Sequence, residues 1–102
     1  MTSIHSIPEA LARLAELPCA TIYEAAGKLG DVSPAIRPML DGIRMAGPAF
    51  TLKTMPGDNL AVFRAIDAAP AGSVLVIDAG GTDRVTIWGG SSTVAAQAKG
   101  LK

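Results

Sequence analysis

The chain has 102 residues, of which 49% are hydrophobic and only 4% are aromatic. A chain of this length buries about two-thirds of its unfolded surface, which suits one small domain with an aliphatic core. Nine Lys and Arg residues balance nine Asp and Glu residues without forming a basic cluster. Because phosphate contacts need a basic footprint, we expect no nucleic-acid partner.

The cysteine content and the hydropathy pattern indicate where the chain works. Cys19 is the only cysteine, so an intrachain disulfide is excluded and a cytoplasmic location is expected. The apolar run at residues 74–77 is far too short to span a bilayer, and the N-terminus lacks the apolar stretch of a signal peptide. We therefore expect no membrane partner. His5 is expected at the surface, and Cys19 is expected to be a small buried residue.

Two helices are predicted at the start of the chain. Ser6 and Glu9 have the spacing of a capping box, and Pro18 closes the helix that they begin. Residues 21–24 repeat the pattern and predict a second short helix that ends at Gly30. The start of the chain is therefore expected to be helical.

The middle of the chain changes from irregular to extended and then to helical. Residues 31–42 are predicted to be an irregular connection, and residues 43–55 show an extended pattern. Gly47-Pro48 interrupts this pattern, which indicates a bulge or an edge strand. Asp58 or Asn59 is placed to cap the helix that follows.

The second half of the chain predicts an α/β fold. The helix over residues 60–69 should turn three side chains toward the core; these are Leu60, Phe63 and Ile66. The unbroken apolar run in residues 73–78 predicts a central strand that is buried on both faces. A strand over 85–88 and a helix over 93–99 follow. All these elements are expected to form one mixed α/β domain.

A two-glycine turn lies between the last predicted strand and the last predicted helix. Gly89-Gly90 would let a ligand approach the backbone, and Ser91-Ser92-Thr93 supplies good N-cap side chains. Unpaired N–H groups at a helix N-terminus attract a carboxylate or a phosphate. The residues alone leave two interpretations open, an anion-binding turn or an ordinary strand-to-helix connection. Asp78 ends a predicted strand, where open α/β sheets place ligands.

Motif strings point to one family. The sequence contains no GxGxxG, GxxxxGK[ST], HExxH or GxSxG string. Several other strings, in order from about Thr21 to the last residue, together resemble the RraA-like, 4-hydroxy-4-methyl-2-oxoglutarate aldolase family. They are IRPM at 36–39, AGPAFT at 46–51, PGDNLA at 56–61, GSVLVID at 72–78, WGG at 88–90 and AAQAKG at 95–100.

The resemblance implies a fold and an activity. The expected fold is a compact β/β/α swivelling-type domain over residues 1–102, assembled as a homotrimer or a hexamer. The expected activity is that of a divalent-metal-dependent pyruvate aldolase, with Mg or Mn, that also decarboxylates oxaloacetate. Its substrate would be a small 2-oxo acid of the pyruvate or oxaloacetate type. Two alternatives stay open: a non-catalytic regulator that binds and inhibits a ribonuclease, and a structural fragment without a ligand.

The resemblance also implies a site. The family's substrate loop begins with a glycine after a strand and offers backbone N–H groups to the pyruvyl carboxylate. By this resemblance the substrate-binding residues are Gly89, Gly90, Ser91, Ser92 and Asn59, and Ser91-Ser92 replaces a more common apolar pair. The family's catalytic Arg-Asp pair, whose Asp holds the metal, is expected shortly beyond Lys102. We therefore expect no catalytic or metal-binding residue in this chain and a domain that is incomplete at its C-terminus.

Overall fold

The structure is a computed structural model that describes residues 6–102, so the prediction for His5 falls outside the described residues. The chain divides into two units, one ending at Ala46 and the other covering Gly47–Lys102. The expectation of a single domain stays a prediction. None of the helices in residues 6–102 is long and apolar enough to cross a membrane.

The first helix of the first unit forms as its sequence predicts. Helix α1 covers Ile7–Glu16, and the Ser6 hydroxyl oxygen accepts a hydrogen bond of 3.3 Å from the Glu9 backbone N–H. At the other end, the Arg44 guanidinium donates to the carbonyl of Leu17 at 2.7 Å. Both ends of α1 therefore receive side-chain hydrogen bonds, which satisfy backbone groups that a helix leaves unpaired.

The second helix differs from the prediction at both ends. Helix α2 covers Cys19–Ala25, and its N-cap is Pro18, without a side-chain cap. The capping box predicted at residues 21–24 is therefore wrong. Pro18 holds an extended backbone, so the helix begins directly after it. Gly27 and Lys28 both have positive φ, at 77° and 63°, and end the helix before Gly30. Residues 31–42 contain no helix or strand, as predicted.

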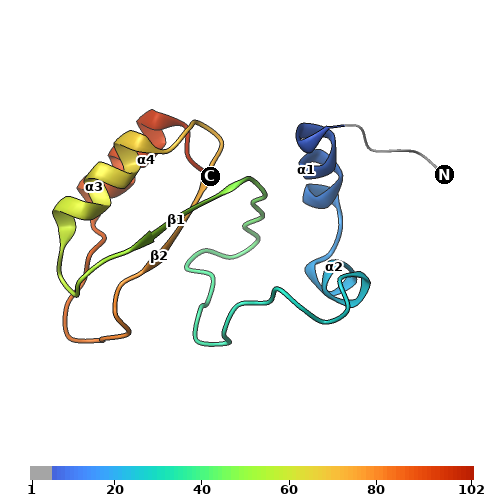
Figure 1. The fold of residues 1–102 in the computed structure, drawn as a ribbon, viewed down its shortest axis with the longest axis horizontal. Coiled ribbons are helices and arrows are strands. Elements are labelled where there is room, and N and C mark those ends of the chain that lie inside the picture. The colour runs from blue at the N-terminus through green and yellow to red at the C-terminus, as the bar shows by residue number, and fades with distance from the viewer. Residues whose placement is uncertain (1–5) are drawn as a thin grey trace. The chain divides into compact units, whose positions relative to one another are not determined.

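The second unit has a parallel two-stranded sheet with two helices (Figure 1). Strand β1 (Ala49–Lys53) pairs along its whole length with strand β2 (Val74–Asp78). Helix α3 (Asn59–Ala68) is the crossover between the strands, and helix α4 (Gly90–Lys99) follows β2. Parallel strands need such a crossover, because the chain leaves the first strand at one edge of the sheet and must return to the opposite edge before the second strand begins. The α/β class predicted from the sequence is confirmed.

The extended segment is shorter than predicted. The strand begins only at Ala49, after Gly47-Pro48, and not near residue 43. Pro48 stands just before the strand, where its missing N–H costs nothing, and its carbonyl accepts from the Val74 N–H at 2.8 Å. Gly47 approaches the Gly72 backbone so closely that a Cβ there would overlap the Gly72 carbonyl oxygen. Gly47-Pro48 is thus the entry to the strand rather than a bulge.

Helix α3 has the predicted N-cap, but it buries a different face from the one predicted. The Asp58 carboxylate accepts from the Ala61 N–H at 3.1 Å. The buried apolar residues of the second unit are Val62, Ala65, Ile66 and Ala69. The prediction was wrong for Leu60 and Phe63, which are 61% and 39% exposed. The buried residues follow the i, i+3, i+4, i+7 spacing of one helix face, and this face leaves out Leu60 and Phe63.

Two predictions about strands are wrong. Val76 in the middle of β2 is 48% exposed, so β2 is not buried on both faces within the described residues. Residues 85–88 do not form a strand. There the Thr86 hydroxyl donates to the Trp88 carbonyl at 3.0 Å and accepts from the Trp88 N–H at 3.3 Å. Such local side-chain bonds compete with a strand for the backbone groups, and they hold this segment as a tight bend.

The close approach at Gly47 gives a stability prediction. Gly47→Ala should lower the free energy of unfolding by about 1–3 kcal/mol, because the added methyl group cannot fit against the Gly72 carbonyl. Gly90→Ala is the matched control, since a Cβ at Gly90 meets no atom within 4 Å and lies in a helix. Urea unfolding followed by circular dichroism measures both variants. Equal unfolding midpoints for Gly47→Ala and the wild type would contradict the close approach.

The corrected face of α3 gives a second prediction. Ile66 is 4% exposed, so Ile66→Ala should cost about 2–5 kcal/mol through lost burial and the cavity left behind. Leu60→Ala removes a side chain that is 61% exposed and should change stability by about 0.5 kcal/mol or less. The same unfolding experiment compares the two variants. A larger loss for Leu60→Ala than for Ile66→Ala would restore the face predicted from the sequence.

Candidate functional site

Both helices of the second unit begin at the edge of the sheet where β1 and β2 end (Figure 1). Helices α3 and α4 pack against each other. Near their C-terminal ends, the Lys99 ammonium group donates to the Asp67 carbonyl at 2.6 Å. The two helices therefore run in the same direction, and their N-termini, at Asn59 and Gly90, lie at one end of the pair. This edge brings together the two segments that contain the residues predicted to bind substrate.

Helix α4 begins earlier than the sequence predicted. Its N-cap is Gly89, with an extended backbone, and its first turn contains Gly90, Ser91 and Ser92. The predicted start at Thr93 is wrong, because Thr93 turns its N–H back to the Gly89 carbonyl at 3.1 Å and so belongs inside the helix. The first four N–H groups of an α-helix have no partner within it, and no side chain caps α4. These groups belong to the four residues of the predicted substrate loop.

Three of the four residues at this helix start are exposed, and the fourth is buried. A Cβ placed on Gly89 or Gly90 would meet no atom within 4 Å, so the backbone there is open to a ligand. Ser91 is exposed, whereas Ser92 is 3% exposed. Residues 89–92 thus carry the four unpaired N–H groups at this helix start, and Ser92 is the one buried residue among them. We name these four groups the anion cradle.

Hydrogen bonds that the sequence did not predict fix the approach to the cradle. The Trp88 indole N–H donates to the Thr93 hydroxyl oxygen at 2.9 Å. The Thr93 hydroxyl in turn donates to the Gly89 carbonyl at 3.2 Å. The sequence signal for the bond to Gly89 was a Thr placed one turn after a glycine N-cap. The bond from Trp88 to the same hydroxyl follows no regular spacing and could not be predicted.

The other predicted residues have structural contacts of their own. Asn59 is the first residue of α3, and its N–H donates to the Gly57 carbonyl at 3.0 Å. Its side chain is exposed and lies at the same end of the helix pair as the cradle. The Asp78 carboxylate accepts from the Gly80 N–H at 3.1 Å, so it stabilises its own loop. Sequence reasoning missed Thr54, whose hydroxyl is buried and has no hydrogen-bond partner among residues 6–102.

The acidic side chains of the described residues do not converge on one point where they could hold a divalent metal. Residues 6–102 contain no group of three or more His, Cys, Asp or Glu side chains placed to hold a metal ion. Hard divalent cations need several oxygen ligands converging on one point. The described side chains therefore do not fit the metal that the family resemblance implies.

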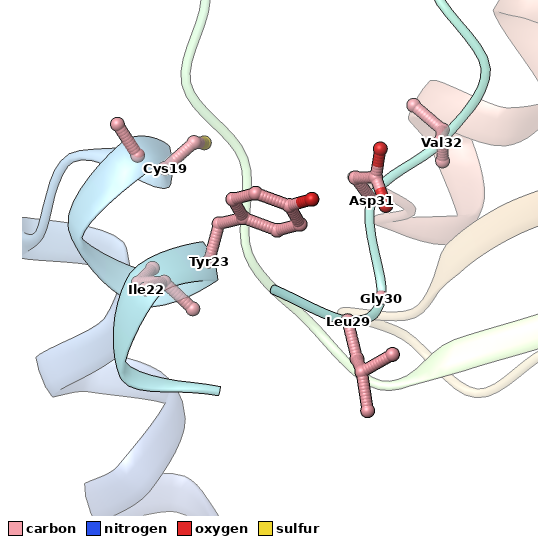
Figure 2. Close-up of a pocket in the computed structure, with 8 residues that line it drawn as sticks. Cys19, Ile22, Tyr23, Leu29, Gly30, Asp31 and Val32 are labelled. Atoms are coloured by element: carbon pink, nitrogen blue, oxygen red, sulfur yellow. The ribbon is translucent and has the colours of Figure 1, made fainter. Parts of the chain in front are cut away.

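A separate pocket lies within the first unit, between α2 and residues 29–32 (Figure 2). It has a volume of about 570 Å³ and is lined mainly by apolar side chains. Tyr23 extends from α2 toward Asp31, and Cys19 lies on the same helix. Cys19 is exposed, which corrects the prediction that it is buried; α2 buries none of its residues. The pocket contains none of the residues predicted to bind substrate.

Comparison with known proteins identifies the family of the chain. The RraA-like family, described as Aldolase/RraA, matches residues 19–102. Similar curated proteins carry the name "Putative 4-hydroxy-4-methyl-2-oxoglutarate aldolase". One from Burkholderia multivorans is 41% identical over 76 residues, which are 74% of this chain and 46% of the relative. One from Halalkalibacterium halodurans is 38% identical over 65 residues, which are 64% of this chain and 31% of the relative.

A third relative, from Burkholderia mallei, is 42% identical over 76 residues, which are 74% of this chain and 46% of the relative. The chain thus spans between about a third and a half of the length of these curated relatives. The family match covers both helices that border the cradle as well as β1 and β2. The chain belongs to the RraA-like family.

Proposed function

We propose that this chain supplies the substrate-carboxylate site of a 4-hydroxy-4-methyl-2-oxoglutarate aldolase. The proposal is supported by the family match over residues 19–102 and by the names of relatives that are about 40% identical. The proposed substrate class is small 2-oxo acids of the pyruvate and oxaloacetate type. The proposed reaction breaks the C3–C4 bond of the substrate and yields pyruvate, with decarboxylation of oxaloacetate as a side activity.

The observation that carries the proposal is the anion cradle at the start of α4. Its N–H groups have no partner within the helix, and they lie at the positive end of the helix dipole. Gly89 and Gly90 leave open space where a Cβ would stand. A carboxylate placed there would accept hydrogen bonds from the backbone and would hold its 2-oxo acid at the carboxyl edge of the sheet. Asn59, at the same end of the helix pair, is the proposed side-chain contact.

The roles of the described residues end at binding and orientation. In this family a divalent metal such as Mg or Mn is expected to supply Lewis-acid chemistry, but residues 6–102 contain no cluster of ligands for it. We assign no step of the reaction to a metal and no catalytic role to a residue of this chain. The proposed assembly is a homotrimer or a hexamer.

Ligand titration tests the cradle. Oxalate, which resembles the carboxylate of a 2-oxo acid, should shift the backbone amide signals of residues 89–93 in a ¹H–¹⁵N NMR titration. A helix N-terminus contributes about 0.3–1 kcal/mol when exposed, so binding should be millimolar or weaker. Gly90→Val should abolish these shifts because its branched side chain occupies the space left open at Gly90.

Ser92→Ala is the control for this titration. It should weaken oxalate binding less than Gly90→Val, because the backbone N–H groups stay in place. Shifts confined to other regions, or equal binding by Gly90→Val and the wild type, would show that residues 89–93 are an ordinary strand-to-helix connection.

The assignment of no catalytic residue gives a second test. The chain of residues 1–102 alone should release no pyruvate from 4-hydroxy-4-methyl-2-oxoglutarate in the presence of Mg or Mn, because the side chains of residues 6–102 form no metal site. Coupling pyruvate to NADH oxidation with lactate dehydrogenase measures the release. Metal-dependent release that a chelator abolishes would contradict the assignment and would direct attention to Asp58, Asp78 and Asp83.

A further inference from the structure

We propose that the side of β2 that faces away from β1 is a docking surface for one extended, apolar strand of a partner polypeptide. The partner strand would run parallel to β2 and add a third strand to the sheet. The register of the sheet and two backbone hydrogen bonds at the start of β2 support this inference. It does not depend on the proposed carboxylate site.

The backbone groups of β2 alternate between its two sides. The Val74 N–H donates to the Pro48 carbonyl at 2.8 Å, and the Asp78 carbonyl accepts at 2.9 Å from the residue that follows β1. Successive residues of a strand point their backbone groups to opposite sides, so Leu75 and Ile77 point theirs away from β1. Within residues 6–102 the sheet has only two strands, so no strand lies beside these groups. We name the backbone groups of Leu75 and Ile77 the open edge.

The position just before the open edge is already paired in a parallel direction. The Ser73 carbonyl accepts from the Lys102 N–H at 2.9 Å, and the Gly72 N–H donates to the Gly100 carbonyl at 2.8 Å. Residue numbers rise together in the two segments, so residues 100–102 run in the same direction as β2 (Figure 1). Helix α4 makes the crossover between them, as α3 does between β1 and β2. A partner strand in this line would meet the open edge in parallel register.

The composition of β2 indicates the chemistry of the partner strand. Residues 74–77 are all Val, Leu or Ile, and Val76 is 48% exposed. Parallel strands with continuous apolar runs are typically covered on both sides. Edge strands instead often carry Pro or Lys, which discourage further pairing, and β1 has Pro48 before it and Lys53 at its end. The open edge has no such residue, so it suits an extended strand of apolar, β-branched residues.

A peptide titration tests the docking surface. The probe is the acetylated and amidated peptide KVTVTVK, whose Val and Thr residues favour a strand and whose lysines keep it in solution. In a ¹H–¹⁵N NMR titration it should shift the amide signals of Leu75 and Ile77 and slow their hydrogen exchange. Leu75→Pro removes one N–H of the open edge and leaves the bonds to β1 in place. It should weaken peptide binding about 2–10-fold, the effect of one hydrogen bond.

Thr51→Pro is the matched control, because Thr51 is in register with Val76 and its N–H points away from β2 on the other side of the sheet. It should bind the peptide as the wild type does, and circular dichroism checks the fold of both variants. The peptide KVTPTVK has the same charge but an interrupted strand, and it should cause no shifts at the open edge even if Leu75→Pro fails to fold.

Three results would overturn the proposal. The first is equal shifts with both peptides, which would show attraction by charge alone. The second is an absence of shifts at Leu75 and Ile77 with KVTVTVK. The third is protection of these two amides by self-association before any peptide is added, which would assign the open edge to a second copy of the chain. Each result would leave the proposed carboxylate site standing.

Discussion

Parallel pairing of β1 with β2 is the constraint on which the second unit depends. A parallel pair cannot be closed by a tight turn, so the chain must return along the sheet between the strands, and α3 makes this return. Helix α4 leaves β2 in the same direction in which α3 leaves β1. Both helices consequently present their N-termini, with unpaired N–H groups, at the edge where the strands end. The location of the candidate site follows from the pairing of the strands before any side chain is considered.

The close contact at Gly47 supports this pairing from the opposite edge. Gly47 lies against the Gly72 carbonyl, and the Pro48 carbonyl accepts from the Val74 N–H. The two strands therefore begin side by side, with their register fixed at the start. A register error of one residue would turn every side chain to the other face of the sheet. The glycine at this position lets the backbones approach, and in this way it contributes to the site without being near it.

The local signals that predicted structure correctly are those in which one side chain bonds to a backbone group a few residues away. Ser6 and Asp58 cap α1 and α3 as their spacing indicated, because such a bond depends on three or four residues only. The same signal was wrong at residues 21–24, where Pro18 already sets the helix start. Where a sequence offers two possible first residues for a helix, the conformation of the preceding backbone decides between them, as Pro18 does for α2.

Predictions that depend on packing were less successful, and the reason is physical. Leu60 and Phe63 have helical spacing to Ile66, yet the buried face of α3 is centred on Val62 and Ile66 and leaves both of them partly exposed. Val76 belongs to an apolar run, but burial of a strand depends on the layers that cover it, which a single apolar run does not specify. The family, by contrast, was identified from short strings that run in order from about Thr21 to the last residue, because their order is independent of how each is packed.

At the candidate site, too, residue spacing predicted some features, whereas others became visible only in the structure. Glycines followed by serines indicated a helix start that is open to an anion, and the four N–H groups of residues 89–92 lie there. The bond from Trp88 to Thr93 spans five residues and joins a bend to a helix, so no regular period predicts it. A helix dipole provides only about 0.3–1 kcal/mol for an exposed anion, so an anion that binds there would also need hydrogen bonds from N–H groups that already point at it before it arrives.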